Sequence, residues 1–174
     1  MSEIYTTGTD GSGGSALLHI HPPLLAAGLL VLGLVIHVAG GGHRHPFPLH
    51  EFLGLLIVAG GIGLSSYAAA LFASRNTTKN PYGEPDAFVV TAPYTFTRNP
   101  MYVGLTAILF GFATFFGSPV MLLAPIAFAV IITRMVIPQE EQTMERLYGE
   151  QYREYKSKVP RWLPVPFGQS SSPS

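Results

Sequence analysis

The sequence predicts an all-α integral membrane protein with about four transmembrane helices, the last two forming a C-terminal helical hairpin. Of its 174 residues, 48% are hydrophobic and only 11% are charged, whereas soluble domains carry about 25% charged residues. Four apolar runs approach the roughly 20 residues that a helix needs to cross a bilayer. We also expect a cytosolic loop before the hairpin and an amphipathic helix after it.

The first predicted span runs from about Pro22 to Ala39 and the second from about Glu51 to Ala73. Small residues are frequent in the second span, at Gly54, Gly60, Gly61, Gly63, Ser65, Ser66, Ala68, Ala69 and Ala70. Such residues let two helix backbones approach closely in lipid. We therefore interpret this run as a packing surface rather than as a site.

The third span is predicted from Pro100 to Phe116 and the fourth from Pro119 to Ile137, joined by a tight turn that makes them an antiparallel hairpin. A residue before proline is disfavoured in the α region, so Asn99 should be extended and act as N-cap of the third helix. Pro100 then fits the first helical position.

Pro138 is expected to end the fourth helix, with Glu140 and Glu141 just beyond it at the membrane surface. The residues that follow predict an amphipathic helix, because apolar and aromatic side chains recur at helical spacing. These are Met144, Leu147, Tyr148, Gln151, Tyr152, Tyr155 and Val159.

We expect one membrane-embedded domain over residues 22–167, a polar and flexible segment over 1–21, and a disordered tail over 168–174. Residues 1–16 contain no Lys or Arg, which argues against a cleavable signal peptide. The net charge is zero, so no nucleic-acid partner is expected. The absence of cysteine excludes disulfides, thiolate nucleophiles and iron–sulfur ligation.

The distribution of basic residues predicts that both termini are cytosolic. With four spans, the termini and the 74–99 loop share one side, which collects Arg75, Lys79, Arg98, Arg146, Arg153, Lys156, Lys158 and Arg161. The opposite side carries Arg44. An excess of Lys and Arg marks the cytosolic face of a membrane protein.

An arginine and two carboxylates stand at the two ends of the apolar hairpin, where unpaired charges are costly and mark a functional site by default. The start of the third helix could bind an anion through its free N–H groups. We interpret Glu140 as functional and leave Glu141 open. Arg134 is expected to extend to the interface. No catalytic residue is assigned; the candidates are Arg98, Arg134 and Glu141.

Residues from about 76 to 165 resemble the integral-membrane methyltransferases of the isoprenylcysteine carboxyl methyltransferase and phospholipid methyltransferase group. The resemblance rests on Tyr94, on Arg98-Asn99-Pro100-Met101-Tyr102-Val103-Gly104, on the hydrophobic hairpin, and on Glu140-Glu141 followed by Tyr148-Gly149, Tyr152 and Tyr155. It implies methyl transfer to a lipophilic acceptor in the membrane, with S-adenosylmethionine bound from the cytosol. The cofactor contacts that it implies are Asp86, Ala87, Phe88, Val89, Tyr94, Asn99, Pro100, Met101, Tyr102 and Glu140.

Three departures from the isoprenylcysteine enzymes concern the substrate. Asn99 and Asp86 stand where those enzymes have histidine, and Val136 stands where they have a substrate-contacting arginine. A carboxylate substrate is usually held by such a guanidinium, so we predict a lipophilic small molecule or a lipid that enters from the bilayer. The Arg-Asn-Pro-Met-Tyr version is similar to the bacterial branch, which implies a bacterial inner membrane. The methylated atom (O, N or S) and the oligomeric state stay open.

The sequence leaves two other function classes as alternatives. Sterol reductases have a similar C-terminal hairpin and use a nicotinamide cofactor, but their ending differs from the Glu140-Glu141 pair. A metal-handling protein is suggested by His19, His21, His43, His45 and His50. The first two and the last three flank opposite ends of the first span, so we expect interfacial histidines and no metal site.

Overall fold

The structure, a computed structural model, describes residues 21–76 and 91–163. These residues form helices and contain no strand. The helices are α1 (Pro22–Ala39), α2 (His50–Asn76) and α3 (Pro100–Phe115), then the 3₁₀ turn η1 (Pro119–Leu122), α4 (Leu123–Ile131), the π-helical turn η2 (Ile132–Val136) and α5 (Ile137–Lys158). The all-helical prediction is confirmed, and the first three predicted spans agree with α1, α2 and α3 to within three residues.

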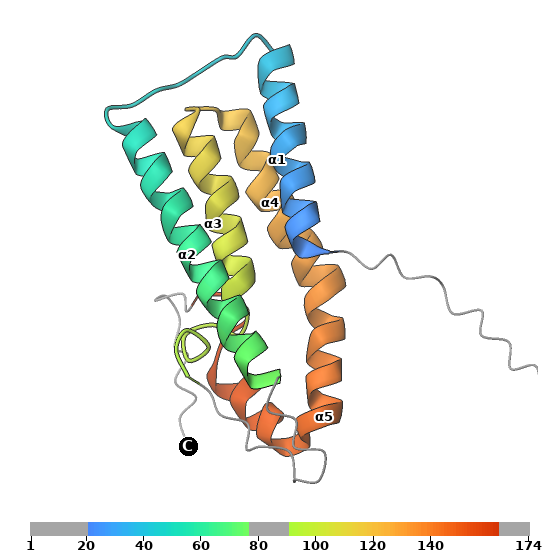
Figure 1. Ribbon diagram of the computed structural model, residues 1–174. Coiled ribbons are helices and arrows are strands. Elements are labelled where there is room, and N and C mark those ends of the chain that lie inside the picture. Colours follow the sequence, from blue (N-terminus) through green and yellow to red (C-terminus); the bar gives the residue numbers. More distant parts are fainter. Residues whose placement is uncertain (1–20, 77–90, 164–174) are drawn as a thin grey trace, which may run out of the picture.

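The helices run up and down as a bundle, and α5 extends beyond it at the end where α3 begins (Figure 1). Within the described residues, three helical stretches are long and apolar enough to cross a membrane: Pro22–Ala39, His50–Leu71 and Pro119–Lys158. Helix α3, with 16 residues, is shorter. We call the end that carries residues 91–99 and α5 the motif end. The far end carries the 40–49 loop and the turn at Gly117.

Glycines bring the backbones of α2 and α3 into direct contact. A Cβ added to Gly61 would lie 2.7 Å from the Gly104 carbonyl oxygen, and one added to Gly104 would lie 2.6 Å from the Gly61 oxygen. Gly54 and Gly111 are equally tight, since a Cβ on either would come within 2.9 Å of backbone in the facing helix. The predicted packing role of the small residues in α2 is confirmed at Gly54 and Gly61. Gly60, by contrast, has nothing within 4 Å of its added Cβ.

Helix α1 packs against α3 and α4 and completes the apolar core. That core contains Ala26, Tyr102, Leu109, Ala124, Phe128, Ile132 and Ile137. At the far end, α1 is tied to the start of η1 by the buried side chains of His37 and Ser118, whose Nδ1 and Oγ lie 2.9 Å apart. The core therefore reaches from the far end down to Tyr102 at the motif end.

The prediction that Pro138 ends the fourth helix is wrong, because η2 leads directly into α5 and the helix runs on to Lys158. A proline inside an α-helix removes one hydrogen bond and crowds the carbonyl four residues earlier, which here belongs to Arg134 in the π turn. A π turn changes which carbonyl each N–H reaches. The chain thus passes Pro138 without a break, and both glutamates lie on a helix.

Gly149 reverses the chain within α5. Its φ of 53° and ψ of −121° are non-helical, and glycine adopts positive φ without the steric cost of a Cβ. An added Cβ would meet nothing within 4 Å, so the backbone angle, not lack of space, requires glycine here. After this residue the chain turns back beneath the bundle (Figure 1), which brings residues 155–162 to the start of α3.

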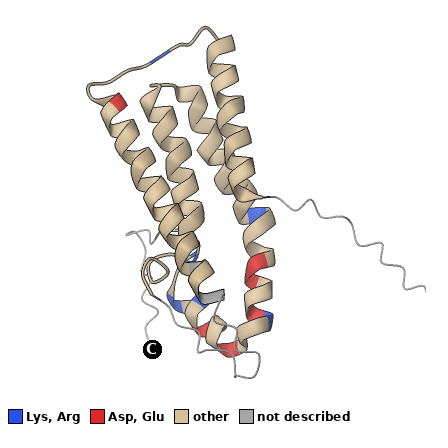
Figure 2. Ribbon diagram, viewed as in Figure 1, with Lys and Arg blue, Asp and Glu red and all other residues tan. Residues whose placement is uncertain are grey.

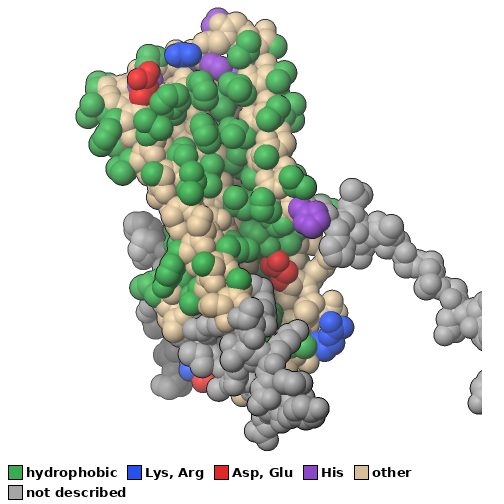
Figure 3. Space-filling view, viewed as in Figure 1, with side chains coloured by type: hydrophobic (Ala, Val, Ile, Leu, Met, Phe, Trp, Pro, Cys, Tyr) green, Lys and Arg blue, Asp and Glu red, His purple; other side chains and the backbone are tan. Residues whose placement is uncertain are grey.

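Charged side chains gather at the two ends of the described bundle and hydrophobic ones cover its middle (Figures 2 and 3). Many of the exposed side chains between the ends are large and apolar, including Leu32, Val35, Phe52, Leu56 and Ile126. An apolar surface of this extent suits contact with lipid. The architecture is that of an integral membrane protein. The predicted division into residues 1–21, 22–167 and 168–174 stays a prediction, since its end segments lie largely outside the described residues.

Candidate functional site

The residues that carry the family resemblance form a motif in two halves, Tyr94 to Gly104 and Glu140 to Tyr155. The two halves meet at a tyrosine–carboxylate pair. Tyr102, in the first turn of α3, donates its hydroxyl to Oε1 of Glu140 on α5 at 2.5 Å. The Tyr102 side chain is buried, and residue Glu140 as a whole is exposed. A carboxylate that accepts from tyrosine on one side and remains open on the other can accept further hydrogen bonds from a ligand.

The neighbouring carboxylate, Glu141, is buried inside a cluster of cations. Arg161 donates to it bidentately, from Nε to Oε1 at 2.9 Å and from Nη2 to Oε2 at 2.7 Å. Arg98 Nη1 lies 2.8 Å from Oε1, and Lys156 Nζ lies 3.8 Å from Oε2. A buried carboxylate with two guanidinium partners holds a structure together. The sequence left open whether Glu141 is functional. In the structure its carboxylate is taken up by ion pairs within the protein.

The π turn decides which of the two glutamates is buried. Between Phe128 and Gly149 the buried positions of this continuous helix are Phe128, Ile132, Ile137 and Glu141, a spacing of four, then five, then four residues. Without the extra residue, steps of four from Phe128 would lead to Glu140 instead. The insertion therefore aims Glu141 at the arginines and leaves Glu140 for the open side.

The chain that returns after Gly149 is fastened to the start of α3. The Arg98 N–H donates to the Pro160 carbonyl at 2.9 Å. The carbonyl of Arg161 accepts from Thr97 Oγ1 at 2.8 Å and from Asn99 Nδ2 at 3.0 Å. Asn99 is the N-cap of α3, but its φ of −128° and ψ of 56° are not extended, and its side chain makes no capping bond. The predicted extended conformation is wrong because this amide serves a tertiary contact.

Two tyrosines join residues 91–99 to their surroundings. The hydroxyl of Tyr155 donates to the Tyr94 carbonyl at 2.7 Å, and the hydroxyl of Tyr94 donates to the Ala68 carbonyl on α2 at 3.3 Å. Tyr94 is therefore tied to both α2 and α5 rather than lying in a simple ring of interfacial aromatics. The last part of the motif, Tyr152 and Tyr155, forms a small buried cluster with Val159.

The three candidate catalytic residues lie in different environments. Arg98 is 9% exposed, pairs with Glu141, and has an Nε without an acceptor among the described residues. Arg134 lies in the π turn on the exposed side, whereas Val136 packs against the core that contains Tyr102. Val136, where the resemblance to the isoprenylcysteine enzymes implied an arginine, is thus an apolar contact here.

Electrostatics separate the two adjacent carboxylates, both of which lie beyond the apolar part of the helix. Burial would raise the pKa of Glu141, but the hydrogen bonds from Arg161 and the charges of Arg98, Arg161 and Lys156 outweigh it and hold the pKa below its usual value. Desolvation raises the pKa of Glu140, the hydrogen bond from Tyr102 opposes the rise, and the charge of Glu141 adds to it.

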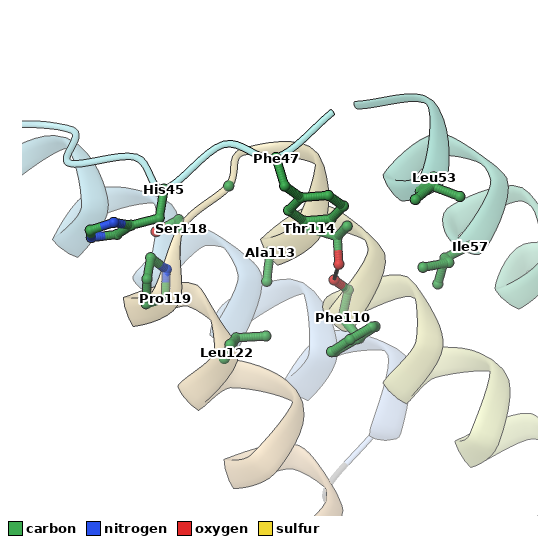
Figure 4. Close-up of a pocket in the computed structure, with 11 residues that line it drawn as sticks. His45, Phe47, Leu53, Ile57, Phe110, Ala113, Thr114, Ser118, Pro119 and Leu122 are labelled. Carbon is green, nitrogen blue, oxygen red and sulfur yellow. Dashed lines mark hydrogen bonds between the residues drawn. The ribbon is translucent and has the colours of Figure 1, made fainter. Parts of the chain in front are cut away.

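A cavity of about 370 Å³ lies at the far end, between α2, α3, η1 and the loop before α2. Figure 4 shows the Phe47 ring over Thr114 and Phe110, at the edge of a cavity with mainly apolar walls. No carboxylate or cation lines it. It does not correspond to the charged motif residues, which gather at the opposite end.

The structure brings Tyr94, Asn99, Pro100, Met101, Tyr102 and Glu140 to the motif end. Asp86, Ala87, Phe88 and Val89 lie outside the described residues. Sequence reasoning missed Arg161 and Trp162, whose indole Nε1 donates to Thr133 Oγ1 at 3.0 Å. A signal was available, since an arginine and the single tryptophan of the chain follow the amphipathic helix directly.

Fold and site together define a helical membrane protein with a polar motif assembled at one end of its bundle. The sequence profile of the family described as phospholipid methyltransferase matches residues 49–151, more than half of the chain. The chain belongs to the phospholipid methyltransferase family. The predicted resemblance to the membrane methyltransferases of the isoprenylcysteine and phospholipid group is confirmed.

Among the named relatives, three are described here. Methanethiol S-methyltransferase of Crocosphaera subtropica is 32% identical over 83 residues, which cover 46% of this chain and 30% of the relative. Methanethiol S-methyltransferase 1 of Bradyrhizobium diazoefficiens is 30% identical over 100 residues, 54% of this chain and 33% of the relative. Protein-S-isoprenylcysteine O-methyltransferase of Homo sapiens is 31% identical over 121 residues, 64% of this chain and 40% of the relative.

The chain thus spans less than half the length of each of these named relatives. No solved structure matches it significantly. The family match favours methyl transfer over the reductase and metal-handling alternatives. In the part of the chain that the structure describes, no three His, Cys, Asp or Glu side chains are grouped to hold a metal ion.

Proposed function

We propose that this protein transfers a methyl group from S-adenosylmethionine to a lipophilic, membrane-borne acceptor, with the donor bound from the cytosolic side. One observation carries the proposal. The Tyr102–Glu140 pair joins the two halves of the family motif at the interfacial end of an apolar bundle, and its carboxylate has an open side. A soluble donor and a lipid-borne acceptor can meet only at such an interface.

The residues at the motif end fit this donor chemically. Its ribose hydroxyls and ammonium group donate hydrogen bonds, and the carboxylate of Glu140 can accept them. The buried Nε of Arg98, which lacks an acceptor among the described residues, suits the carboxylate of the methionine moiety. We propose that Tyr94, Asn99, Pro100, Met101 and Tyr102 shape the same site, together with Asp86, Ala87, Phe88 and Val89.

When bound, S-adenosylmethionine supplies a methyl group on a sulfonium sulfur, which passes to a nucleophilic atom while the sulfur keeps the electrons of the broken bond as a neutral thioether. The protein must orient the two reactants and exclude water, since positioning supplies much of such catalysis. Tyr102 is suited to this role because its ring packs in the apolar core while its hydroxyl fixes Glu140.

The acceptor is proposed to be a lipophilic small molecule or a lipid without a carboxylate at the reacting group. Val136 packs into the apolar cluster beside Tyr102, so this position offers no guanidinium. One named relative methylates the sulfur of methanethiol, and another the oxygen of protein S-isoprenylcysteine. Family membership is therefore compatible with more than one acceptor atom.

Donor binding is tested by thermal unfolding of the detergent-solubilised protein. A ligand that binds only the folded state raises the unfolding temperature, so S-adenosylmethionine should stabilise the wild type. In Glu140→Gln the shift should be smaller, and the apparent affinity derived from it should fall at least tenfold. Glu150→Gln changes an exposed carboxylate of the same helix and should leave the affinity unchanged. Equal affinity in wild type and Glu140→Gln would remove Glu140 from the donor site.

Acceptor class is tested by incubating the protein with methyl-labelled S-adenosylmethionine and either a total lipid extract or a farnesylated cysteine analogue. We expect label in the lipid extract and poor turnover of the analogue. Efficient turnover of the analogue that is lost in Arg134→Ala would show that Arg134 replaces the missing arginine. That result would contradict the proposed acceptor class.

A further inference from the structure

The segment Val159–Leu163, here called the strap, contacts the residues just before α3, the π turn and α5. Its backbone accepts hydrogen bonds from Thr97, Arg98 and Asn99 at the start of α3. The indole of Trp162 donates to Thr133 in the π turn and packs against the core that contains Tyr102. The strap lies inside the stretch 76–165 that resembles the membrane methyltransferases, but none of its residues is among the predicted site residues.

Arg161 links two elements through two different groups. Its main-chain carbonyl accepts from Thr97 and Asn99, which precede α3, and its guanidinium grips Glu141 on α5 with two hydrogen bonds. Tyr102 lies three residues after Asn99, and Glu140 lies one residue before Glu141. The relative position of the pair that carries the proposed function therefore depends on Arg161.

We infer that Arg161 is a positioning residue for the methyl-donor site, acting through Glu141 to place Glu140 against Tyr102. The inference rests on the proposed function, because it assumes that Glu140 contacts the donor. Arg161 has 38% of its side chain exposed. Its charge is retained at every working pH, so it holds Glu141 ionised and fixed while ligand binds.

The pH dependence of binding separates this role from a purely structural one. Glu140 faces Tyr102 from α3 and Glu141 from its own helix, and Glu141 faces Arg98, Arg161 and Lys156. Without Arg161, the charge of Glu141 is less neutralised and disfavours ionisation of Glu140 more strongly. Donor affinity should then fall on acidification at a higher pH than in the wild type.

The experiment measures S-adenosylmethionine affinity against pH for the wild type, Arg161→Ala, Arg161→Lys and the control Arg153→Ala, which changes an exposed arginine of α5. Trp162 is the single tryptophan, so its emission reports whether the strap stays docked in each variant. We expect at least a tenfold loss of affinity and an upward shift of the pH midpoint in Arg161→Ala, an intermediate loss in Arg161→Lys, and no change in Arg153→Ala.

If Arg161→Ala binds S-adenosylmethionine with the same affinity and the same pH midpoint as the wild type, the inference is overturned and the proposed function stays intact. If Arg161→Ala does not fold, Arg161→Lys decides: weaker binding with wild-type Trp162 emission supports the inference, and wild-type binding overturns it. A wild-type protein that does not bind S-adenosylmethionine would instead overturn the proposed function itself.

Discussion

Two identical, adjacent side chains, Glu140 and Glu141, lie in opposite environments in this protein. Glu141 is 6% exposed and saturated by guanidinium groups, whereas Glu140 accepts from Tyr102 and keeps an open side. A carboxylate that has lost its water is stable only with charge partners or strong hydrogen bonds. The fully paired carboxylate belongs to the structure, and the partly open one is free for a ligand.

At the residue scale we predict that Glu141→Gln lowers the free energy of unfolding by about 3–5 kcal/mol, because it leaves the buried Arg98 and the partly exposed Arg161 without their countercharge. Thermal unfolding in detergent measures the loss. Glu145→Gln is the control: its pair with Lys156 is more than one third exposed on both sides, so it should cost less than about 1 kcal/mol.

The same substitution has a defined pH dependence. The folded pKa of Glu141 is lowered from 4.5, so its stabilising contribution is complete above that value and disappears as the pH falls through the folded pKa. The difference in unfolding temperature between wild type and Glu141→Gln should therefore shrink on acidification below about pH 4.5. A difference that stays constant in acid would contradict the ion-pair account.

At the scale of elements, the tightest contact in the bundle is the glycine-lined interface of α2 and α3. We predict that Gly61→Ala lowers stability by about 1–3 kcal/mol, since its methyl group would overlap the Gly104 carbonyl and backbones cannot shift freely. The adjacent Gly60→Ala should be neutral, because its methyl group meets nothing within 4 Å. Equal effects of the two changes in thermal unfolding would refute the contact.

Elements differed in how far the sequence predicted them. Apolar length and the turn residues sufficed for α1, α2 and α3, because the bilayer imposes a length and proline marks the start of α3. The continuation through Pro138 was not predictable, since a π turn depends on the partners of Thr133 and Glu141 in the folded chain. The chain reversal was present in the motif as Gly149, but only its positive φ shows what that glycine does.

At the scale of the whole molecule, the described basic residues beyond the bundle gather at the motif end, with Arg44 at the far end (Figure 2). We predict that the motif end is cytosolic. In spheroplasts of cells that express the protein, a membrane-impermeant thiol reagent should label His43→Cys, whereas Ser74→Cys and Ser157→Cys should react only after lysis. The native chain has no cysteine, so each variant carries a single label site.

Labelling of Ser74→Cys or Ser157→Cys before lysis would contradict the predicted orientation and with it the cytosolic access of the donor.

The sequence predicted the membrane class and the meeting of the two motifs, because both depend on local patterns. It did not predict how the motifs are held together. That arrangement depends on Arg161 and Trp162, which reach the site only after the chain has turned back at Gly149.

The π turn between α4 and α5 also affects how this chain should be compared with others. It adds one residue to a continuous helix, and the same face of the helix is buried before and after the turn. A relative that crosses the same region in regular α-helical turns would need one residue fewer to present the same faces. Correct pairing of the two chains then requires a single-residue gap inside a helix, between Ile132 and Val136. Counting backwards from the glutamate pair across this gap would compare side chains that point in different directions.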